Sequence, residues 1–494
     1  MSVTHPPLTS APRVAATSSS FLEERPLRYP DASSRAVMTR RGWWLILLNF
    51  LLPGSAQVLA GNRRLGRFGL GATLAMWVIL ILGGVTMMLW PAVGVSVAVG
   101  AWIPDWLAWF RWLPLTIVQA ALIGYAVLWG FLTIDTLRLV RLVRTGSLAR
   151  FGIAVVSVLL LVGASSGAAY AASVAGAVRD SFADLFGASA PVVPPSDGYY
   201  NILMLGADSG EGRDSMRYDS ISVVSINADT GAVTITGIPR DMPGFPFAPG
   251  PMQDQYPDGH KGHADARCGW GSGINQLRTE VEVCQDGTKL YPDAVANGST
   301  PAVEATKDAA EGILGIQIPY YVFIDMHGFA ALVDALGGVD VTVEQRLPEG
   351  GGPAYPGQSA EEWASGWIEP GAQHMDGDTA QWYARSRYTT DDFDRMKRQR
   401  QLQQAILAQF TPQNVLARFQ DVAAAGTAIV ETDLPQGLIA PTLVDLALKA
   451  KSQPVTTVEL SPPLVDEYEP DFAFIQQYMQ QTLHPPTPTP APGG

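Results

Sequence analysis

Charged residues that could bind a phosphate group gather in three short segments of this 494-residue chain. In the first segment, Asp208 directly follows one apolar strand-like run, and Arg217 and Asp219 directly precede the next. Two carboxylates at strand ends can share a Mg²⁺ ion with phosphate oxygens, and a neighbouring arginine can contact the same phosphate. An isolated aspartate in such a place more often caps a turn or forms a surface ion pair. This segment therefore becomes informative only together with the other two.

The second and third segments add arginines. Arg240 and Asp241 end the strand-like run 233–238, and this pair alone would suit a structural ion pair. Arg385 and Arg387 alternate further on, so on an extended segment both side chains would face the same way. Arginine stays charged and binds phosphate through two parallel hydrogen bonds. Dense arginine in an acidic part of the chain thus favours a phosphate site.

A helix expected over residues 395–410 follows the arginine pair. Arg395 and Gln399 are four residues apart and share one face of this helix. Arg398 is a further candidate for substrate binding, although a solvated helix face with salt bridges to nearby aspartates would explain Arg398 and Arg400 equally well.

Other motifs give weaker signals. The chain has two cysteines, Cys268 and Cys284, and in an exported domain they predict one disulfide; two unpaired buried thiols are the alternative. His260, His263 and Asp265 could form a metal site with Cys268, but their Gly-rich surroundings favour the disulfide. The glycine-rich segment after residue 205 lacks the Gly-Lys-Ser/Thr ending of a P-loop, and no Gly-x-Ser-x-Gly elbow exists.

The elements that position these residues belong to the second part of the chain, which differs in charge from the first. Residues 1–180 contain 15 Lys and Arg against 6 Asp and Glu, whereas the rest contains 18 against 40. A basic apolar part followed by an acidic polar part is typical of a membrane module followed by an exported domain. The acidic part excludes non-specific nucleic-acid binding, which needs a positive field.

Four apolar stretches form the expected membrane module: 43–60, 68–90, 113–136 and 151–172. The last three are long enough to span a bilayer, which takes about 20 residues. The first is broken at residues 52–55 and has arginines on both sides, so we expect a re-entrant or interfacial hairpin. Four arginines within residues 138–150 mark a cytoplasmic flank before the last span, which places everything after it outside.

These observations predict five regions. Residues 1–37 form a disordered cytoplasmic tail, 38–175 the transmembrane module, 176–198 a linker, 199–483 an extracytoplasmic domain and 484–494 a disordered tail. In the domain we expect strands at 201–205, 220–226, 233–238 and 338–343, and helices at 302–314, 329–336 and 395–410. Strands mixed with helices indicate an α/β fold.

Three blocks of the sequence resemble the LytR-CpsA-Psr family. They are NILMLGADSGEGRDSMRYDSISVVSINADTGAVTITGIPRD, YYVFIDMHGFAALVDALGGVDVTV and GAQHMDGDTAQWYARSRYTTDDFDRMKRQRQ, in the family's order and within residues 199–410. The resemblance implies a central mixed sheet flanked by helices and a hydrophobic pocket for a polyprenyl chain. It also implies an enzyme of the cytoplasmic membrane, a phosphotransferase that moves a glycopolymer from a polyprenyl-pyrophosphate carrier to a peptidoglycan hydroxyl. The implied partners are the lipid-linked glycan, peptidoglycan and membrane lipid.

The family's functional positions carry over residue by residue. Its magnesium carboxylates fall on Asp208 and Asp219, its polar helix position on Gln399, and Asp241 completes its Pro-Arg-Asp sequence. Its pyrophosphate arginines fall on Arg217, Arg240, Arg385, Arg387 and Arg395.

The chain departs from the family at one block. Where the family has Lys-Ile-Asn, this chain has Gly273, Ile274 and Asn275, followed by a long insertion. Arg278 and Lys261 are candidates to replace the missing charge.

Two rival functions use the same residues. A lipid-binding regulator without activity should lack an Asp or Arg of the site, and this chain has all of them. A pyrophosphatase would pass the glycan to water instead of a wall hydroxyl, and the residues do not separate hydrolysis from transfer. Displacement at a pyrophosphate builds negative charge, which arginines and a cation stabilise, and Asp219 and Asp241 are candidates to take the acceptor proton.

Overall fold

The structure, a computed structural model, falls into two compact units. Unit 1 contains Met1–Gly84 and Gln119–Ala172, and unit 2 contains Val85–Val118 and Ser173–Gly494. The residues described are 27–103, 107, 110–185, 192–207, 217–263, 271, 273–350, 352–386, 388, 392–409, 430–466 and 468–485.

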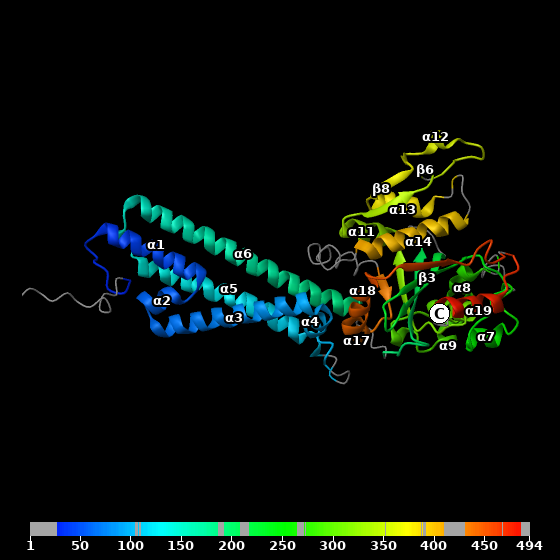
Figure 1. Cartoon of the computed structure of the whole chain (residues 1–494), viewed down its shortest axis with the longest axis horizontal. Helices are drawn as coiled ribbons and strands as arrows, with labels where there is room; N and C mark the ends of the chain where they lie inside the picture. The colour runs from blue at the N-terminus through cyan, green and yellow to red at the C-terminus, as the bar shows by residue number, and fades with distance from the viewer. Residues whose placement is uncertain are drawn as a thin grey trace, which may run out of the picture. The chain divides into compact units, whose positions relative to one another are not determined.

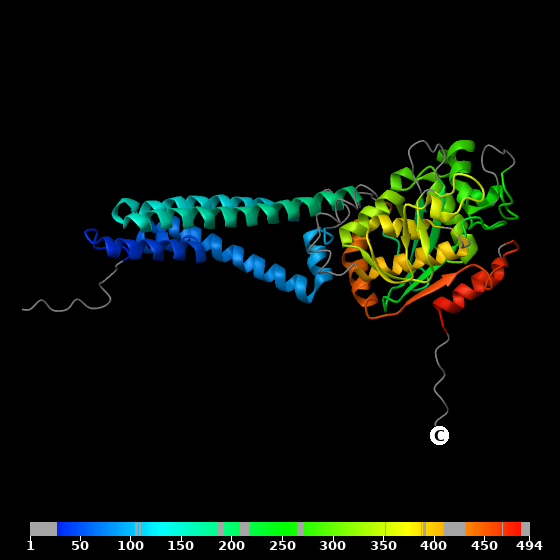
Figure 2. The same cartoon turned by 90° about the horizontal axis from the view of Figure 1, so that it is seen from above.

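Three long apolar helices occur in the first part of the chain (Figure 2): α3 (Arg63–Leu89), α5 (Leu113–Val140) and α6 (Ser147–Leu185). The segments Arg63–Leu89, Leu113–Arg144 and Ser147–Asp180 are long and apolar enough to cross a membrane. They coincide with the three spans expected from the sequence. Helix α6 continues to Leu185, into the expected linker, because its last turns are rich in alanine and contain no proline.

The first apolar stretch forms two helices instead of one. Helix α1 (Arg35–Leu51) and α2 (Ser55–Ala60) are separated by a turn in which Gly54 has φ of +98°. Within unit 1, Asn49 Nδ2 donates to Thr133 Oγ1 at 3.0 Å. This stretch is absent from the described helices that could span a membrane, as the break in its sequence predicted.

A six-stranded mixed sheet forms the centre of unit 2, with strand order β10-β3-β2-β1-β4-β9. β1, β2 and β3 are antiparallel neighbours, whereas β4 lies parallel to β1, and β10 lies parallel to β3. The strands are β1 (Tyr199–Ala207), β2 (Tyr218–Asn227), β3 (Val233–Ile238), β4 (Tyr320–Asp325), β9 (Val430–Thr432) and β10 (Val455–Glu459). This mixed sheet flanked by helices confirms the predicted fold class.

The two faces of the sheet have different partners. One face packs into the main hydrophobic core against α10 (Pro301–Leu314) and α19 (Phe472–Leu483). Towards the other face lies α14 (Asp392–Gln409), whose Gln403 Nε2 donates to Ser222 Oγ of β2 at 3.2 Å (Figure 1). Alternation along the strands gives each face its own set of side chains.

A smaller core adjoins the central sheet. It is formed by two two-stranded sheets, with β5 paired to β8 and β6 to β7, together with the helices beside them. Its elements are α11 (Met326–Leu336), β5 (Val339–Val343), β6 (Leu347–Glu349), α12 (Ala360–Trp363), β7 (Gly366–Ile368), β8 (Gly371–Met375) and α13 (Gly377–Arg385). Valines that point inward from β5 pack against α13 and α14, so this core fixes the helices that carry the third arginine segment.

Further short helices occur among the described residues. They are η2 (Leu142–Arg144), α4 (Pro91–Ala98), α7 (Pro251–Gln255), η4 (Ile274–Gln276), α8 (Leu277–Thr279), η5 (Glu280–Cys284), α9 (Gly287–Leu290), η6 (Val295–Asn297), α17 (Gln436–Leu438), η7 (Ile439–Leu443) and α18 (Val444–Ala450).

The hairpin between β2 and β3 forms as predicted. The Asn227 side-chain oxygen accepts hydrogen bonds from the backbone N–H groups of Asp229 and Thr230, at 3.1 and 2.9 Å. Gly231 has φ of +72°, a conformation that glycine adopts without steric cost. The expected strands and helices are confirmed within a few residues, but β4, β9, β10 and α19 were not anticipated.

Candidate functional site

The first two charged segments meet at one end of the two inner strands β2 and β3. Ile221 of β2 pairs with Ile238 of β3, so the residues that begin β2 lie beside the chain that leaves β3. Arg240 consequently reaches back across the pair, and its Nη1 donates a hydrogen bond to Asp219 Oδ1. Its Nε also donates to Asp241 Oδ2 at 3.2 Å. One guanidinium thus holds two carboxylates, Asp219 of β2 and Asp241 of the loop after β3.

The start of α14 joins the same cluster through Asp392. Arg395 Nη2 lies 3.0 Å from one carboxylate oxygen of Asp392, and Arg240 Nη2 lies 3.9 Å from the other. Asp392 therefore bridges two arginines that are far apart in the sequence. Sequence reasoning did not single out Asp392, although its position three residues before Arg395 on a helix was the available signal.

The electrostatics of this cluster keep Arg240 charged and accessible. Burial alone would lower the pKa of Arg240, but the carboxylates of Asp241, Asp392 and Asp219 reverse this effect and raise it. The Arg240 side chain is 17% exposed and that of Arg395 only 5%. A bound phosphate would find two guanidinium groups whose positions are already fixed by aspartates.

The block that departs from the family forms the support of the Arg240 loop. Asn275 donates its backbone N–H to Arg240 O at 3.0 Å and its side-chain amide to Asp241 Oδ1 at 3.1 Å. A Cβ added at Gly273 would lie 2.9 Å from both Arg240 O and Asp241 Cα. Such a contact is too close for a side chain, so this close approach favours glycine where the family has lysine.

Arg278 lies near the start of β2. Lys261, by contrast, shows no contact with the arginine and aspartate cluster among the described residues. The Arg278 guanidinium carbon is 5.9 Å from the ring centroid of Tyr218, which stands between Arg217 and Asp219. Burial raises the pKa of the Tyr218 hydroxyl, and the charge of Arg278 offsets part of this rise. Arg278 is therefore the better placed of the two candidates to replace the missing lysine charge.

Arg398 and Gln399 connect the end of α13 to α14. Arg398 donates from Nε to Tyr383 O at 3.0 Å and from Nη2 to Ser386 O, and Gln399 Nε2 donates to Ala384 O at 3.4 Å. Orphan carbonyls at a helix C-terminus need such donors. These contacts tie the end of the helix that carries Arg385 to the helix that carries Arg395.

The alternative of a solvated helix face for Arg398 and Arg400 is wrong, because only 5% and 2% of these residues are exposed. Arg400 packs towards the sheet, where its Nε lies 3.5 Å from Glu459 Oε1 and its Nη2 donates to Ser220 Oγ at 3.4 Å. Burial lowers the pKa of Arg400 and raises that of Glu459. The sequence missed this pairing because β10, which carries Glu459, was not anticipated.

Arg385 is the last residue of α13, so the expectation of an extended segment is wrong at this position. The chain becomes extended only at Ser386, and the Arg385 guanidinium carbon lies 5.5 Å from the Trp382 ring centroid. The alternation argument assumed a strand, but the capped helix begun by Asp376 extends to Arg385.

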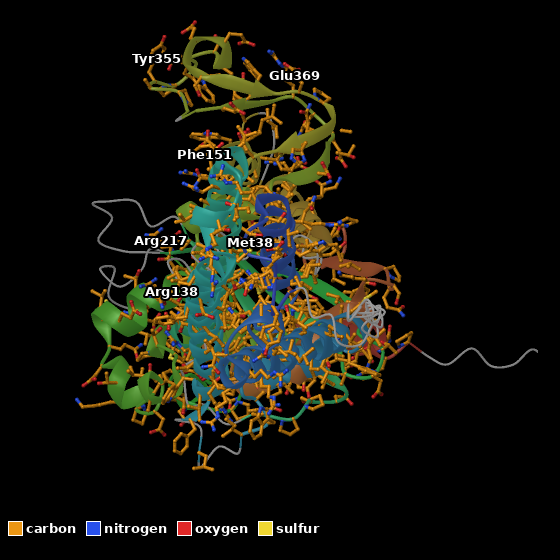
Figure 3. All side chains as sticks on the ribbon, turned by 90° about the vertical axis from the view of Figure 1, so that its left-hand side faces the viewer. Met38, Arg138, Phe151, Arg217, Tyr355 and Glu369 are labelled. Atoms are coloured by element: carbon orange, nitrogen blue, oxygen red, sulfur yellow. The ribbon has the colours of Figure 1, made fainter. Side chains whose placement is uncertain are left out.

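Three of the predicted site residues lie outside the described residues: Asp208, Arg387 and Cys268. Ala207, which precedes Asp208 in the sequence, ends β1 and pairs with Tyr218. Arg217 is half-buried directly before β2 (Figure 3). Cys284 ends η5 and is not a free thiol, so its pairing with Cys268 stays a prediction.

The alternative metal site is unsupported where the structure can be described. His260 is fully buried, and its Nε2 lies 2.8 Å from Glu280 Oε2. The rings of Phe245, Phe247 and Tyr256 surround it. Among the described residues no three His, Cys, Asp or Glu side chains are grouped to hold a metal ion. His260 and Glu280 thus form a buried polar pair.

The chain thus combines an α/β domain, in which arginines and aspartates gather where β2 begins and β3 ends, with three preceding apolar helices. A family model described as the LytR_cpsA_psr family matches residues 165–243 and 285–483. This match covers more than half of the chain, and the chain belongs to the LytR-CpsA-Psr family. The model leaves residues 244–284 unmatched, and most of them precede the position after Asn275 where the insertion was expected.

Individual relatives cover part of the chain. The "polyisoprenyl-teichoic acid–peptidoglycan teichoic acid transferase TagU" of Bacillus cereus (strain AH820) is 30% identical over 239 residues, which are 48% of this chain and 61% of the relative. "Biofilm regulatory protein A" of Streptococcus mutans is 25% identical over 241 residues, 48% of this chain and 50% of the relative. The chain thus spans about three fifths or less of the length of these relatives.

Solved structures also resemble this chain. The crystal structure of Bacillus subtilis TagV has a TM-score of 0.38 and 22% identity, and the likeness covers 58% of this chain and 97% of that one.

Proposed function

We propose that this protein transfers a glycopolymer from a polyprenyl-pyrophosphate carrier to a hydroxyl group of peptidoglycan. The observation that carries the proposal is the joint contact of Arg240 with Asp219, Asp241 and Asp392, which unites three distant segments around two arginines. The relatives named as teichoic acid transferases support the same reaction class.

The proposed transfer reaction requires stabilisation of negative charge on the phosphate groups. The acceptor hydroxyl oxygen attacks the phosphorus that carries the glycan, a new P–O bond forms, and the bond to the polyprenyl phosphate breaks. Charge then develops on the leaving phosphate, where Arg240 and Arg395 can neutralise it without rearrangement because aspartates already hold them. Arg217 and Arg385 are proposed to contact the remaining phosphate oxygens, as is Arg387.

The lipid part of the carrier needs an apolar surface next to the arginines. Met204 of β1, Val224 of β2, and Val322 and Ile324 of β4 remain partly exposed, unlike their neighbours in the main core. All four belong to the face of the sheet opposite that core, and Met204 pairs with Val322. We propose that this face receives the polyprenyl chain.

A magnesium ion and a proton acceptor complete the proposed site. Asp219 is 31% exposed beside Arg240 and can give one carboxylate oxygen to Mg²⁺, with Asp208 as the second ligand and substrate phosphates as the rest. When bound, the ion would supply further neutralisation of phosphate charge. Asp241 is 66% exposed and so is more accessible to an acceptor hydroxyl than Asp219, which makes it the proposed proton acceptor.

Transfer can be tested with full-length protein in detergent. The protein is incubated with a polyprenyl-pyrophosphate oligosaccharide, Mg²⁺ and peptidoglycan fragments, and the products are identified by mass spectrometry. A peptidoglycan fragment that gains the mass of the phosphorylated oligosaccharide supports transfer. Free phosphorylated oligosaccharide in its place would indicate a pyrophosphatase, and unchanged substrate with retained binding would indicate a lipid-binding regulator.

We also propose a multi-pass topology in which the domain lies outside the cytoplasmic membrane. It rests on the three apolar helices and on the arginines between α5 and α6. A reporter fused after Thr136 should report the cytoplasm, and one fused after Ser196 the outside. If both fusions report the cytoplasm, this topology is wrong. In an oxidising exterior, a disulfide between Cys268 and Cys284 would close the insertion.

A further inference from the structure

We propose that an aromatic arm formed by residues 344–370 binds the uncharged glycan strand of the acceptor. The arm contains β6, β7 and the loop with α12. This inference rests on the proposed function and adds a second binding surface to it, distinct from the arginine site.

The arm is built on the smaller core and reaches the loop after α13. At its root, Leu347 pairs with Ile368, and both side chains are buried beside Tyr383 of α13. In the loop between β6 and β7, Trp363 ends α12, and its ring centroid lies 5.8 Å from that of Tyr388 at an interplanar angle of 77°. Tyr388 directly follows the site residue Arg387 in the sequence. A ligand held by the arm is therefore held next to the chain segment that carries the site arginines.

The arm presents several aromatic rings at its surface. Tyr355 is 56% exposed and its hydroxyl donates to Glu362 at 3.3 Å (Figure 3). Trp367 is half-buried, and the Arg346 guanidinium carbon lies 3.7 Å from its ring centroid. Such rings outside a core need an explanation, because exposed aromatic groups commonly mark binding sites. The apolar C–H face of a pyranose ring stacks on aromatic rings of this kind.

Polar groups beside the rings suit sugar hydroxyls. The Trp363 Nε1–H is enclosed and has no acceptor among the described residues, whereas a buried donor normally has one. Glu349 pairs with Gly366 across the hairpin, and burial together with Asp378 and Asp376 raises the pKa of its carboxyl. The partly buried Glu349 carboxyl can exchange hydrogen bonds with sugar hydroxyl groups.

The charge of the arm selects between the two substrates. Residues 344–370 contain five glutamates and a single arginine. A donor polymer rich in phosphate would be repelled by this surface, whereas an uncharged glycan would not. The arm therefore fits the acceptor strand, and the arginine site fits the donor.

The test uses full-length protein in detergent and a soluble oligomer of β-linked N-acetylglucosamine as the probe, with a glycerol phosphate oligomer as the anionic comparison. Binding is measured by isothermal titration calorimetry. The wild type should bind the uncharged oligomer in preference to the anionic one. Trp363→Ala and Tyr355→Ala should each raise its Kd up to about tenfold, the equivalent of one aromatic contact. Trp363→Phe should keep most of the affinity.

The matched control is Lys449→Ala, which removes an exposed ion pair with Asp445 on α18 and should leave the Kd unchanged. Tyr355→Ala decides the matter if Trp363→Ala does not fold, since Tyr355 is exposed. Equal affinity of the wild type and both alanine variants, or preference for the anionic oligomer, would overturn the proposal. Transfer from the lipid-linked donor to peptidoglycan fragments, measured in parallel, should be unchanged in Lys449→Ala. If the wild type transfers no oligosaccharide to peptidoglycan fragments, the transfer reaction is refuted, while the binding result still decides the role of the arm.

Discussion

Replacing Arg240 by alanine should disable the reaction while leaving the fold intact. The side chain contacts Asp219, Asp241 and Asp392, and it belongs to none of the three hydrophobic clusters described in unit 2. Removing one preorganised donor of this kind costs roughly 3–4 kcal/mol of transition-state stabilisation, or about 10²–10³ in kcat. The loss of stability should be smaller, about 1 kcal/mol, because Asp219, Asp241 and Asp392 are 31%, 66% and 33% exposed and can be solvated.

Two further variants separate charge from geometry. Arg240→Lys keeps the charge but cannot make two parallel hydrogen bonds, so it should recover only part of the lost rate. Lys397→Ala is the matched control on α14, because it removes an exposed cation that lies 2.8 Å from Glu344. This control should keep wild-type turnover, since Lys397 does not contact the aspartate cluster in the described structure.

The assay follows the appearance of glycosylated peptidoglycan fragments at saturating donor, with circular dichroism and thermal unfolding as checks of folding. A folded Arg240→Ala variant with turnover within about threefold of the wild type would refute the role of charge stabilisation at this site. An equal loss in Lys397→Ala would show that the effect is one of overall charge and not of the cluster.

Three other predictions follow from the same structure. Asp219→Asn should raise the Mg²⁺ concentration for half-maximal activity, measured by titration, and an unchanged value would remove Asp219 from the metal site. Burial raises the pKa of Asp308 to about 7 from the ordinary 3.8, so the folded state keeps this proton at higher pH than the unfolded chain does. The free energy of unfolding should therefore fall as the pH rises from about 4 to about 7, by roughly 1.4 kcal/mol per unit of pKa at most, and Asp308→Asn should flatten this decline in urea titrations. Cys268 and Cys284 should resist alkylation in the unreduced native protein, and their replacement by serine should cost about 3 kcal/mol of stability; two reactive thiols would contradict the disulfide.

Local patterns were sufficient for much of the fold. Val233–Ile238 alternates and follows a turn sequence, and it forms β3 with the expected bounds. The three apolar stretches predicted the three long helices, because hydropathy and length are properties of the sequence alone. β10 was missed because its short, half-exposed sequence gains its stability from pairing with β3, and a parallel neighbour so far along the chain leaves no local signal.

For the site, the sequence determined which charges exist and the tertiary structure decided which of them meet. The types and order of Asp219, Arg240 and Arg395 predicted a phosphate site without any coordinates. Only the folded chain shows that Asp392 bridges Arg240 and Arg395, that Asn275 holds the Arg240 loop, and that Arg400 is buried against the sheet. The physical reason is that ion pairs and buried polar contacts depend on distances between segments, and those distances are set by strand pairing and helix packing instead of by residue type.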